Sequence, residues 1–132
     1  MKKLVLCLFF SLMGFFAFAE EGGKSVKTST ENGRYEIIQS ELARRQTFRL
    51  DKKTGSVFLL VTTKSGKDAW EEMEVIGKYV DDTSAEINYQ IFIGGTAASD
   101  CFLINIYSGK TWQLFRDTDT KTLFWAPMSV NY

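Results

Sequence analysis

The sequence contains an internal repeat, found when the chain is aligned with itself at an offset of 54 positions. Residues 35–61 align with residues 89–115 without a gap, and six of the 27 pairs are identical, where average residue usage would give about one or two. The identical pairs are Tyr35/Tyr89, Ile37/Ile91, Ala43/Ala97, Phe48/Phe102, Gly55/Gly109 and Leu60/Leu114. After a one-residue insertion, Trp70, Met73 and Val75 align with Trp125, Met128 and Val130. The chain is therefore predicted to use one supersecondary unit twice.

Each unit is predicted to consist of short β-strands. Residues 35–39, 47–51 and 56–62 are rich in β-branched and aromatic residues and partly alternate, and a fourth strand is expected at 70–75, matched by 125–130. Asp51 and Gly55 enclose the turn between the second and third strands, where Asp accepts backbone hydrogen bonds and Gly adopts the left-handed conformation. Asn105 and Gly109 repeat this turn chemistry. No long segment has a convincing helical period.

The fold class predicted from these strands is all-β, with about eight short antiparallel strands in two repeated units. Because a four-stranded unit of this size is not expected to be stable alone, the two units should pack as a small sandwich or close into a small barrel. The expected core consists of the positions that are apolar in both units. These are Tyr35, Ile37, Phe48, Leu50, Phe58 and Leu60 in the first unit, and Tyr89, Ile91, Phe102, Ile104, Trp112 and Leu114 in the second.

The hairpin sequence resembles a known blade motif. Leu50-Asp51-x-x-Thr54-Gly55 is matched by Ile104-Asn105-x-x-Ser108-Gly109, with Trp112 three residues further on, and this pattern is similar to blades of quinoprotein-type β-propellers. The resemblance covers about a dozen residues in each unit. Since two blades are too few for a propeller, it implies a blade pair that closes by oligomerising.

The amino-terminal residues are typical of a targeting segment. Lys2 and Lys3 precede an apolar run over residues 4–16, and Ala17-Phe18-Ala19 is a signal-peptidase pattern. We therefore expect a signal peptide at 1–19, a flexible polar lead-in at 20–33 and a single β domain at 34–132 whose repeats span about 35–75 and 89–130. Cleavage after Ala19 predicts a periplasmic or secreted protein with no transmembrane segment and with Cys101 as its one cysteine, most simply a buried one.

The composition argues against most catalysis. The chain has no His, and it carries 16 basic and 16 acidic side chains, so His-based triads and metal sites are excluded, as is the overall basic excess of nucleic-acid binders. We expect no enzyme activity, cofactor, metal or nucleic-acid partner. The alternative is a small extracytoplasmic enzyme that uses carboxylates such as Glu71, Glu72 and Glu74, although strand alternation places Glu71 on the face opposite the other two.

Two groups of residues are candidate contact sites. A basic group around the first hairpin, which the second unit lacks, is predicted to contact an anionic partner: Arg44, Arg45, Arg49, Lys52 and Lys53. The apolar residues Val57, Leu59 and Val61 are predicted to form an interface on the sheet face opposite Phe58 and Leu60, covered by the 77–84 connection, a second copy or a ligand. The function expected is an exported, non-catalytic binding or structural module of the cell envelope, whose partner is an unknown protein, an anionic envelope component or a second copy.

Overall fold

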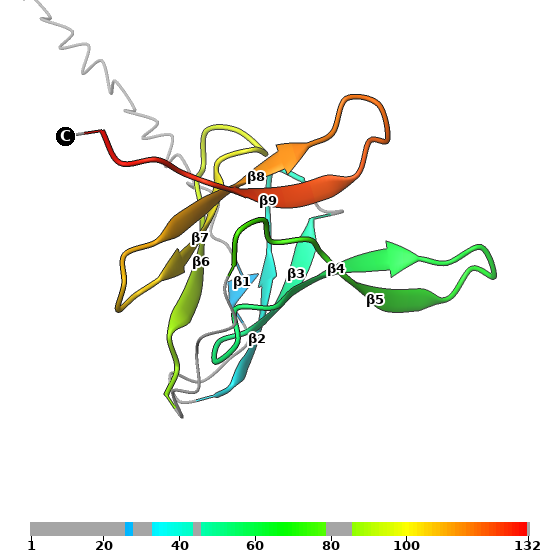
Figure 1. Ribbon diagram of the computed structural model, residues 1–132. Helices are drawn as coiled ribbons and strands as arrows, with labels where there is room; N and C mark the ends of the chain where they lie inside the picture. Colours follow the sequence, from blue (N-terminus) through cyan, green and yellow to red (C-terminus); the bar gives the residue numbers. More distant parts are fainter. Residues whose placement is uncertain (1–25, 28–32, 44–45, 79–85, 132) are drawn as a thin grey trace, which may run out of the picture.

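The computed structural model describes residues 26–27, 33–43, 46–78 and 86–131, and it is all-β, as predicted (Figure 1). The first sheet has the order β1-β2-β3-β4-β5 and the second has the order β6-β7-β8-β9, with every pair antiparallel. The strands are β1 (Val26–Lys27), β2 (Tyr35–Gln39), β3 (Thr47–Asp51), β4 (Val57–Thr62), β5 (Asp68–Glu72), β6 (Tyr89–Ile93), β7 (Cys101–Asn105), β8 (Thr111–Arg116) and β9 (Leu123–Pro127). The two sheets pack as a small sandwich and do not close into a barrel.

Most of the predicted strands lie where the sequence placed them. The exceptions are β5 and β9, which begin at Asp68 and Leu123 and end before the predicted limits. The residues that follow β5 have another partner, because the N–H of Met73 donates to the carbonyl of Val57. Within the predicted 20–33 lead-in, residues 26–27 pair with β2, and residues 1–25 and 28–32 lie outside the described part.

The two predicted hairpin turns have the same hydrogen bonds. Oδ1 of Asp51 accepts from the backbone N–H groups of Lys53 and Thr54, and Oδ1 of Asn105 accepts from the equivalent groups two and three residues on. Gly55 and Gly109 have φ angles of 71° and 70°. This left-handed conformation is less stable by about 1–2 kcal/mol for a residue that has a side chain. The repeated unit is thus a repeated structure as well as a repeated sequence.

The core lies between the two sheets. The first sheet contributes Ile38, Phe48, Leu50 and Val57, and the second contributes Tyr89, Ile91, Cys101, Leu103, Trp112, Leu114 and Trp125, with Met73 from the link after β5. The expected core was therefore wrong at Tyr35, Ile37, Phe58, Leu60, Phe102 and Ile104, which are exposed or half-buried. Residues paired across antiparallel strands share a face, and Ile38 pairs with Phe48 whereas Ile37 pairs with Arg49.

The sheets bury opposite faces of the repeated unit. The second sheet buries Tyr89 and Ile91, whose equivalents Tyr35 and Ile37 lie on the outer face of the first sheet. The first sheet instead buries Ile38, whose equivalent Phe92 is 62% exposed on the outer face of the second sheet. The packing of the two units is therefore head to tail: the face of the second unit that carries Tyr89 and Ile91 lies on the face of the first unit that carries Ile38, and these two faces are not equivalent in the repeat.

Contacts from both sheets hold this junction together. The rings of Phe48 and Trp125 meet edge to face, with centroids 5.8 Å apart. The segment after β5 runs alongside β9, because the Trp125 N–H donates to the Glu74 carbonyl and the Ile76 N–H donates to the Trp125 carbonyl, both at 2.9 Å. Nε1 of Trp112 donates to the carbonyl of Ile76, also at 2.9 Å. Among the described residues there is no helix suited to crossing a membrane.

Candidate binding surfaces

The outer face of the first sheet carries apolar and aromatic side chains on β2 to β5. Ile37, Arg49, Phe58 and Glu72 form one cross-strand row, and Leu60 pairs with Trp70 beside it. Tyr35 and Ile37 are 52% and 39% exposed, while Phe58, Leu60 and Trp70 are half-buried. A sheet face that is directed to solvent normally alternates to polar residues, so this face has the composition of a contact surface.

Arg49 lies in the middle of that outer face and is held by aromatic rings. Its guanidinium carbon is 4.3 Å from the ring centroid of Phe58 and 5.3 Å from that of Trp70. Both distances are within the range of a cation–π interaction. The Arg49 side chain of β3 is thus packed against aromatic residues of β4 and β5 on the same outer face.

The outer face of the second sheet is also largely apolar. Phe92 pairs with Phe102, and their ring centroids are 6.3 Å apart; Phe115 pairs with Phe124, and those rings stack at 6.2 Å. Phe92 and Phe115 are exposed. Each sheet therefore presents an apolar face away from the shared core.

A hollow of about 840 Å³ lies at the edge of this second outer face. It is lined by the β7–β8 turn at Gly109, by Phe102 and Thr111, and by Met128 and Val130 from the segment after β9. Met128 and Val130 are 46% and 70% exposed. The lining is mostly apolar, without a cluster of titratable groups among these residues.

The predicted basic group does not form one cluster among the described residues. Arg49 lies over the rings of Phe58 and Trp70, Lys52 is buried at the turn after β3, and Lys53 is half-exposed beside it. Arg44 and Arg45 lie outside the described residues. Contact of this group with an anionic partner stays a prediction.

The predicted apolar interface at Val57, Leu59 and Val61 faces inward. Val57 is fully buried in the core, Leu59 packs against it, and Val61 follows on the same side by alternation. Val57 and Leu59 are thus covered by the core between the two sheets of the same chain, whereas Val61 is half-buried and is not part of that core. Residues 79–84 of the 77–84 connection lie outside the described residues, so cover of Val61 by that connection, a second copy or a ligand stays a prediction. The residues left for outside contacts are those on the opposite face, at Phe58 and Leu60.

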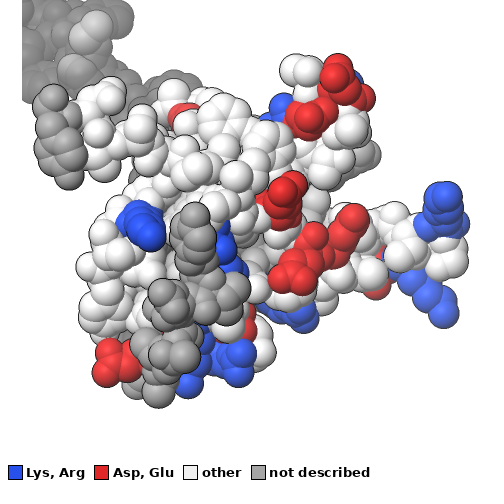
Figure 2. Space-filling view, in the orientation of Figure 1, with Lys and Arg blue, Asp and Glu red and all other residues white. Residues whose placement is uncertain are grey.

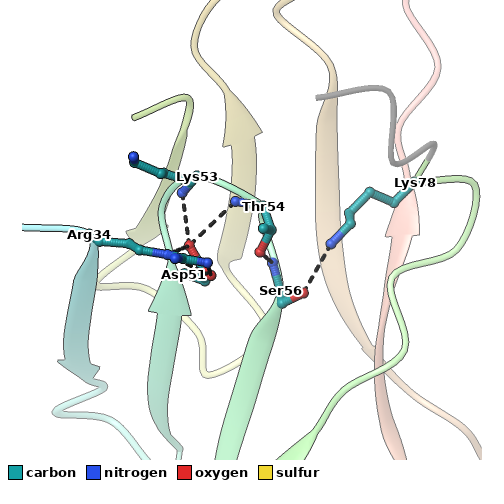
Figure 3. Close-up of polar contacts among 6 residues, drawn as sticks. All are labelled: Arg34, Asp51, Lys53, Thr54, Ser56 and Lys78. Atoms are coloured by element: carbon teal, nitrogen blue, oxygen red, sulfur yellow. Dashed lines mark hydrogen bonds and ion pairs between the residues drawn. The ribbon is translucent and has the colours of Figure 1, made fainter. Parts of the chain in front are cut away.

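An ion pair fixes the start of the first hairpin turn (Figure 3). Nη2 of Arg34 is 2.7 Å from Oδ2 of Asp51, and Nε is 3.1 Å from both carboxylate oxygens. Burial of the Asp51 carboxyl opposes its ionisation, but hydrogen bonds from Arg34 and from the backbone of Lys53 and Thr54 outweigh that cost and lower its pKa. Lys78 reaches the same turn, since its Nζ is 3.3 Å from Oγ of Ser56.

The carboxylates considered for catalysis are exposed. Figure 2 shows acidic side chains gathered beside β5 and basic side chains at the tip of the β4–β5 hairpin. Glu71 pairs with Leu59 and Glu72 pairs with Phe58, so these neighbours point to opposite faces, as the alternation predicted. Within the described ranges no three His, Cys, Asp or Glu side chains form a group that could hold a metal ion.

The two outer faces were missed by the sequence reasoning, although the turn contained the signal for the first. The N–H of Asp51 donates to the carbonyl of Ser56, which places Leu50 opposite Val57 and Phe48 opposite Leu59. Extending that register from the Asp51–Gly55 turn would have separated Phe58 and Leu60 from Phe48 and Leu50. Comparison with known proteins found no matching family model, curated protein or solved structure.

Proposed function

We propose that this chain is a non-catalytic binding or structural module, exported to the cell envelope, that acts through protein contacts made by the outer faces of its two sheets. The observation that carries this proposal is the composition of those faces, which present cross-strand rows of aromatic and aliphatic side chains from β2–β5 and β6–β9. Aromatic residues and Arg are enriched at protein interfaces. The outer face of the first sheet carries both kinds of residue, with Arg49 over the rings of Phe58 and Trp70. Export is supported by the signal-peptide pattern over residues 1–19.

The test uses the full chain in the cell that produces it. An envelope extract is separated by size, and the chain is followed in the parent and in three variants. Tyr35→Asp and Phe92→Asp place a charge on the outer face of the first and second sheet, at residues 52% and 62% exposed. Leu42→Asp is the matched control, because Leu42 is 53% exposed in the β2–β3 connection.

The parent and Leu42→Asp are expected in complexes larger than one chain, and at least one outer-face variant should lose them. A buried charge without a partner is costly at an interface, so the loss should be at least tenfold. If both outer-face variants remain in the same complexes as the parent, the outer faces are not the contact surface and the proposal fails.

A further inference from the structure

The contact between the two sheets of this chain is made by two different sheet faces, one from each repeated unit. In each case the equivalent face of the other unit lies on the outside of the molecule. From this we infer that copies of the chain associate head to tail, with the outer face of the first sheet of one copy packed on the outer face of the second sheet of the next. The inference rests on the proposed function, since it names a second copy of this chain as the protein that the outer faces contact.

The first half of the contact is the face that the second sheet buries. Five of the seven core residues that the second sheet contributes recur on the outer face of the first sheet with little change of chemistry, whereas Cys101 and Leu103 are replaced there by Thr47 and Arg49. The pairs, with the outer-face residue first, are Tyr35/Tyr89, Ile37/Ile91, Phe58/Trp112, Leu60/Leu114 and Trp70/Trp125. Most of the surface that holds the second sheet in the sandwich is therefore present a second time on the outside of the first sheet, where its residues are exposed or half-buried.

The other half is the face that the first sheet buries, and its equivalents lie on the outer face of the second sheet. The pairs, again with the outer-face residue first, are Phe92/Ile38, Phe102/Phe48, Ile104/Leu50, Thr111/Val57 and Gln113/Leu59. The polar departures are Thr111 and Gln113 on this face, and Arg49 and Glu72 on the outer face of the first sheet, where the second unit has Leu103 and Pro127. The side-chain oxygens of Thr111 and Gln113 are able to accept hydrogen bonds from Arg, and the Gln113 amide is able to donate one to a carboxylate.

The hollow beside Gly109 is equivalent in the repeat to the space beside Gly55 in the first unit. Around Gly55 the ring of Tyr89 fills the space, with three ring atoms 2.7–2.9 Å from where a Cβ atom would lie. Gly109 has the same turn and nearly the same φ, but no atom of the described residues lies within 4 Å of its Cβ position. A neighbouring copy would place Tyr35 over Gly109 as Tyr89 lies over Gly55.

The segment after β9 supports the same geometry. Residues 74–76 follow β5 and pair with Trp125 of β9. Their equivalents after β9 are residues 129–131, which are exposed and pair with no strand in the described part of the chain. The equivalent of Trp125 is Trp70, on β5 at the edge of the first sheet. Residues 129–131 of one copy can therefore pair with Trp70 of the next, as residues 74–76 pair with Trp125.

Contacts of this kind are heterologous, so they produce rings where the rotation closes and filaments where it does not. The test measures the mass of the purified full chain by sedimentation velocity over a range of concentrations. Assemblies of two or more copies are expected to grow with concentration. A parent that remains a monomer up to about 1 mM, where even weak association is populated, overturns the inference.

Two complementary variants determine the direction of the contact. Tyr35→Asp blocks only the first-sheet face, and Phe92→Asp blocks only the second-sheet face. Each is expected to be monomeric alone, while an equimolar mixture forms a dimer and nothing larger, because one intact face of each kind remains. Leu42→Asp should assemble like the parent. Circular dichroism and thermal melting first verify that each variant is folded, which its exposed position favours.

Two other results would overturn the head-to-tail inference. If one variant is a dimer alone and mixing adds nothing, the contact is two-fold symmetric and the head-to-tail inference is wrong. If the pure chain is monomeric but Tyr35→Asp or Phe92→Asp abolishes complexes in the envelope extract, the partner is a different protein. In that case the inference fails and the proposed function stands.

Discussion

The ring of Tyr89 lies directly on Gly55, so close that a methyl group on Gly55 would overlap three of its atoms at 2.7–2.9 Å. Tyr89 begins the second sheet, and Gly55 ends the turn that leads into β4 of the first. The N–H groups of Asn88 and Tyr89 also both donate to the carbonyl of Lys52 in the same turn. This turn is thus a docking point for the second sheet as well as a hairpin connection.

Gly55→Ala should destabilise the fold more than Gly109→Ala. Both glycines have φ near 70°, which costs alanine about 1–2 kcal/mol. Only Gly55 adds overlap with the Tyr89 ring, and overpacking adds about 1–3 kcal/mol. Urea unfolding at a concentration where the chain is monomeric measures both. Equal losses of unfolding free energy would show that the Tyr89 ring moves aside without cost.

Trp125→Ala and Trp70→Ala change equivalent positions of the repeat and should have unequal effects. Trp125 is fully buried against Phe48, so its loss should cost about 3–5 kcal/mol. Trp70 is half-buried on the outer face beside Arg49, and its loss should cost no more than about 2 kcal/mol in the monomer. Thermal melting compares the two variants. A larger loss for Trp70→Ala would contradict the assignment of inner and outer faces.

Asp51→Asn should remove part of the dependence of stability on acid pH. The folded pKa of Asp51 is lowered, so its contribution is complete above the unfolded pKa of about 3.9 and is lost as the pH falls through the folded pKa. Asn at this position keeps the turn, as Asn105 does, but loses the ion pair with Arg34. We expect a loss of about 1–2 kcal/mol at pH 7.

The measurement is urea unfolding of parent and Asp51→Asn from pH 7 to pH 2. The difference in unfolding free energy between them should shrink as the pH falls below about 4. Asn105→Ala is a control for the turn alone, since Asn105 carries no charge. A difference that stays constant over this range would mean that the Arg34–Asp51 pair contributes no net stability.

Cys101 should be unreactive while the chain is folded. The thiol is fully buried, and this burial, together with the charge of Asp100, raises its pKa to about 11. A disulfide reagent at pH 8 should modify it at least 100-fold more slowly in buffer than in denaturant, because the thiolate is the reactive form. Cys7→Ser removes the other thiol where the first 19 residues are retained. Rapid modification in buffer would show that β7 opens readily.

The strands and turns were predictable from the sequence because they are local features. The Asp51–Gly55 turn and its copy at Asn105–Gly109 are specified by the residues themselves, and the hairpins formed as expected. Which face of each strand is buried is not a local feature. Ile37 and Ile38 are both apolar, and only the pairing of Ile38 with Phe48 and of Ile37 with Arg49 separates them.

The repeat itself caused the remaining errors in the predicted core. We expected positions that are apolar in both units to be buried in both, but those positions are divided between the two faces of each unit, and the two units would also have to present the same face to each other. They present opposite faces, so Tyr89 is buried while its equivalent Tyr35 is exposed. A repeat that packs head to tail needs two apolar faces in every unit. The sequence pattern alone does not reveal which of these two faces is left on the outside of the sandwich.

The strand pairing has a consequence for the order of folding. Within the described ranges, every pair of hydrogen-bonded strands joins neighbours along the chain, so each sheet can form through short loops at low entropic cost. Contacts such as Phe48 with Trp125 span far more of the chain, and we expect docking of the sheets to be the slower step. A newly synthesised first sheet can meet the second sheet of its own chain or that of another copy. Domain swapping is therefore the misfolding route that this architecture most readily permits.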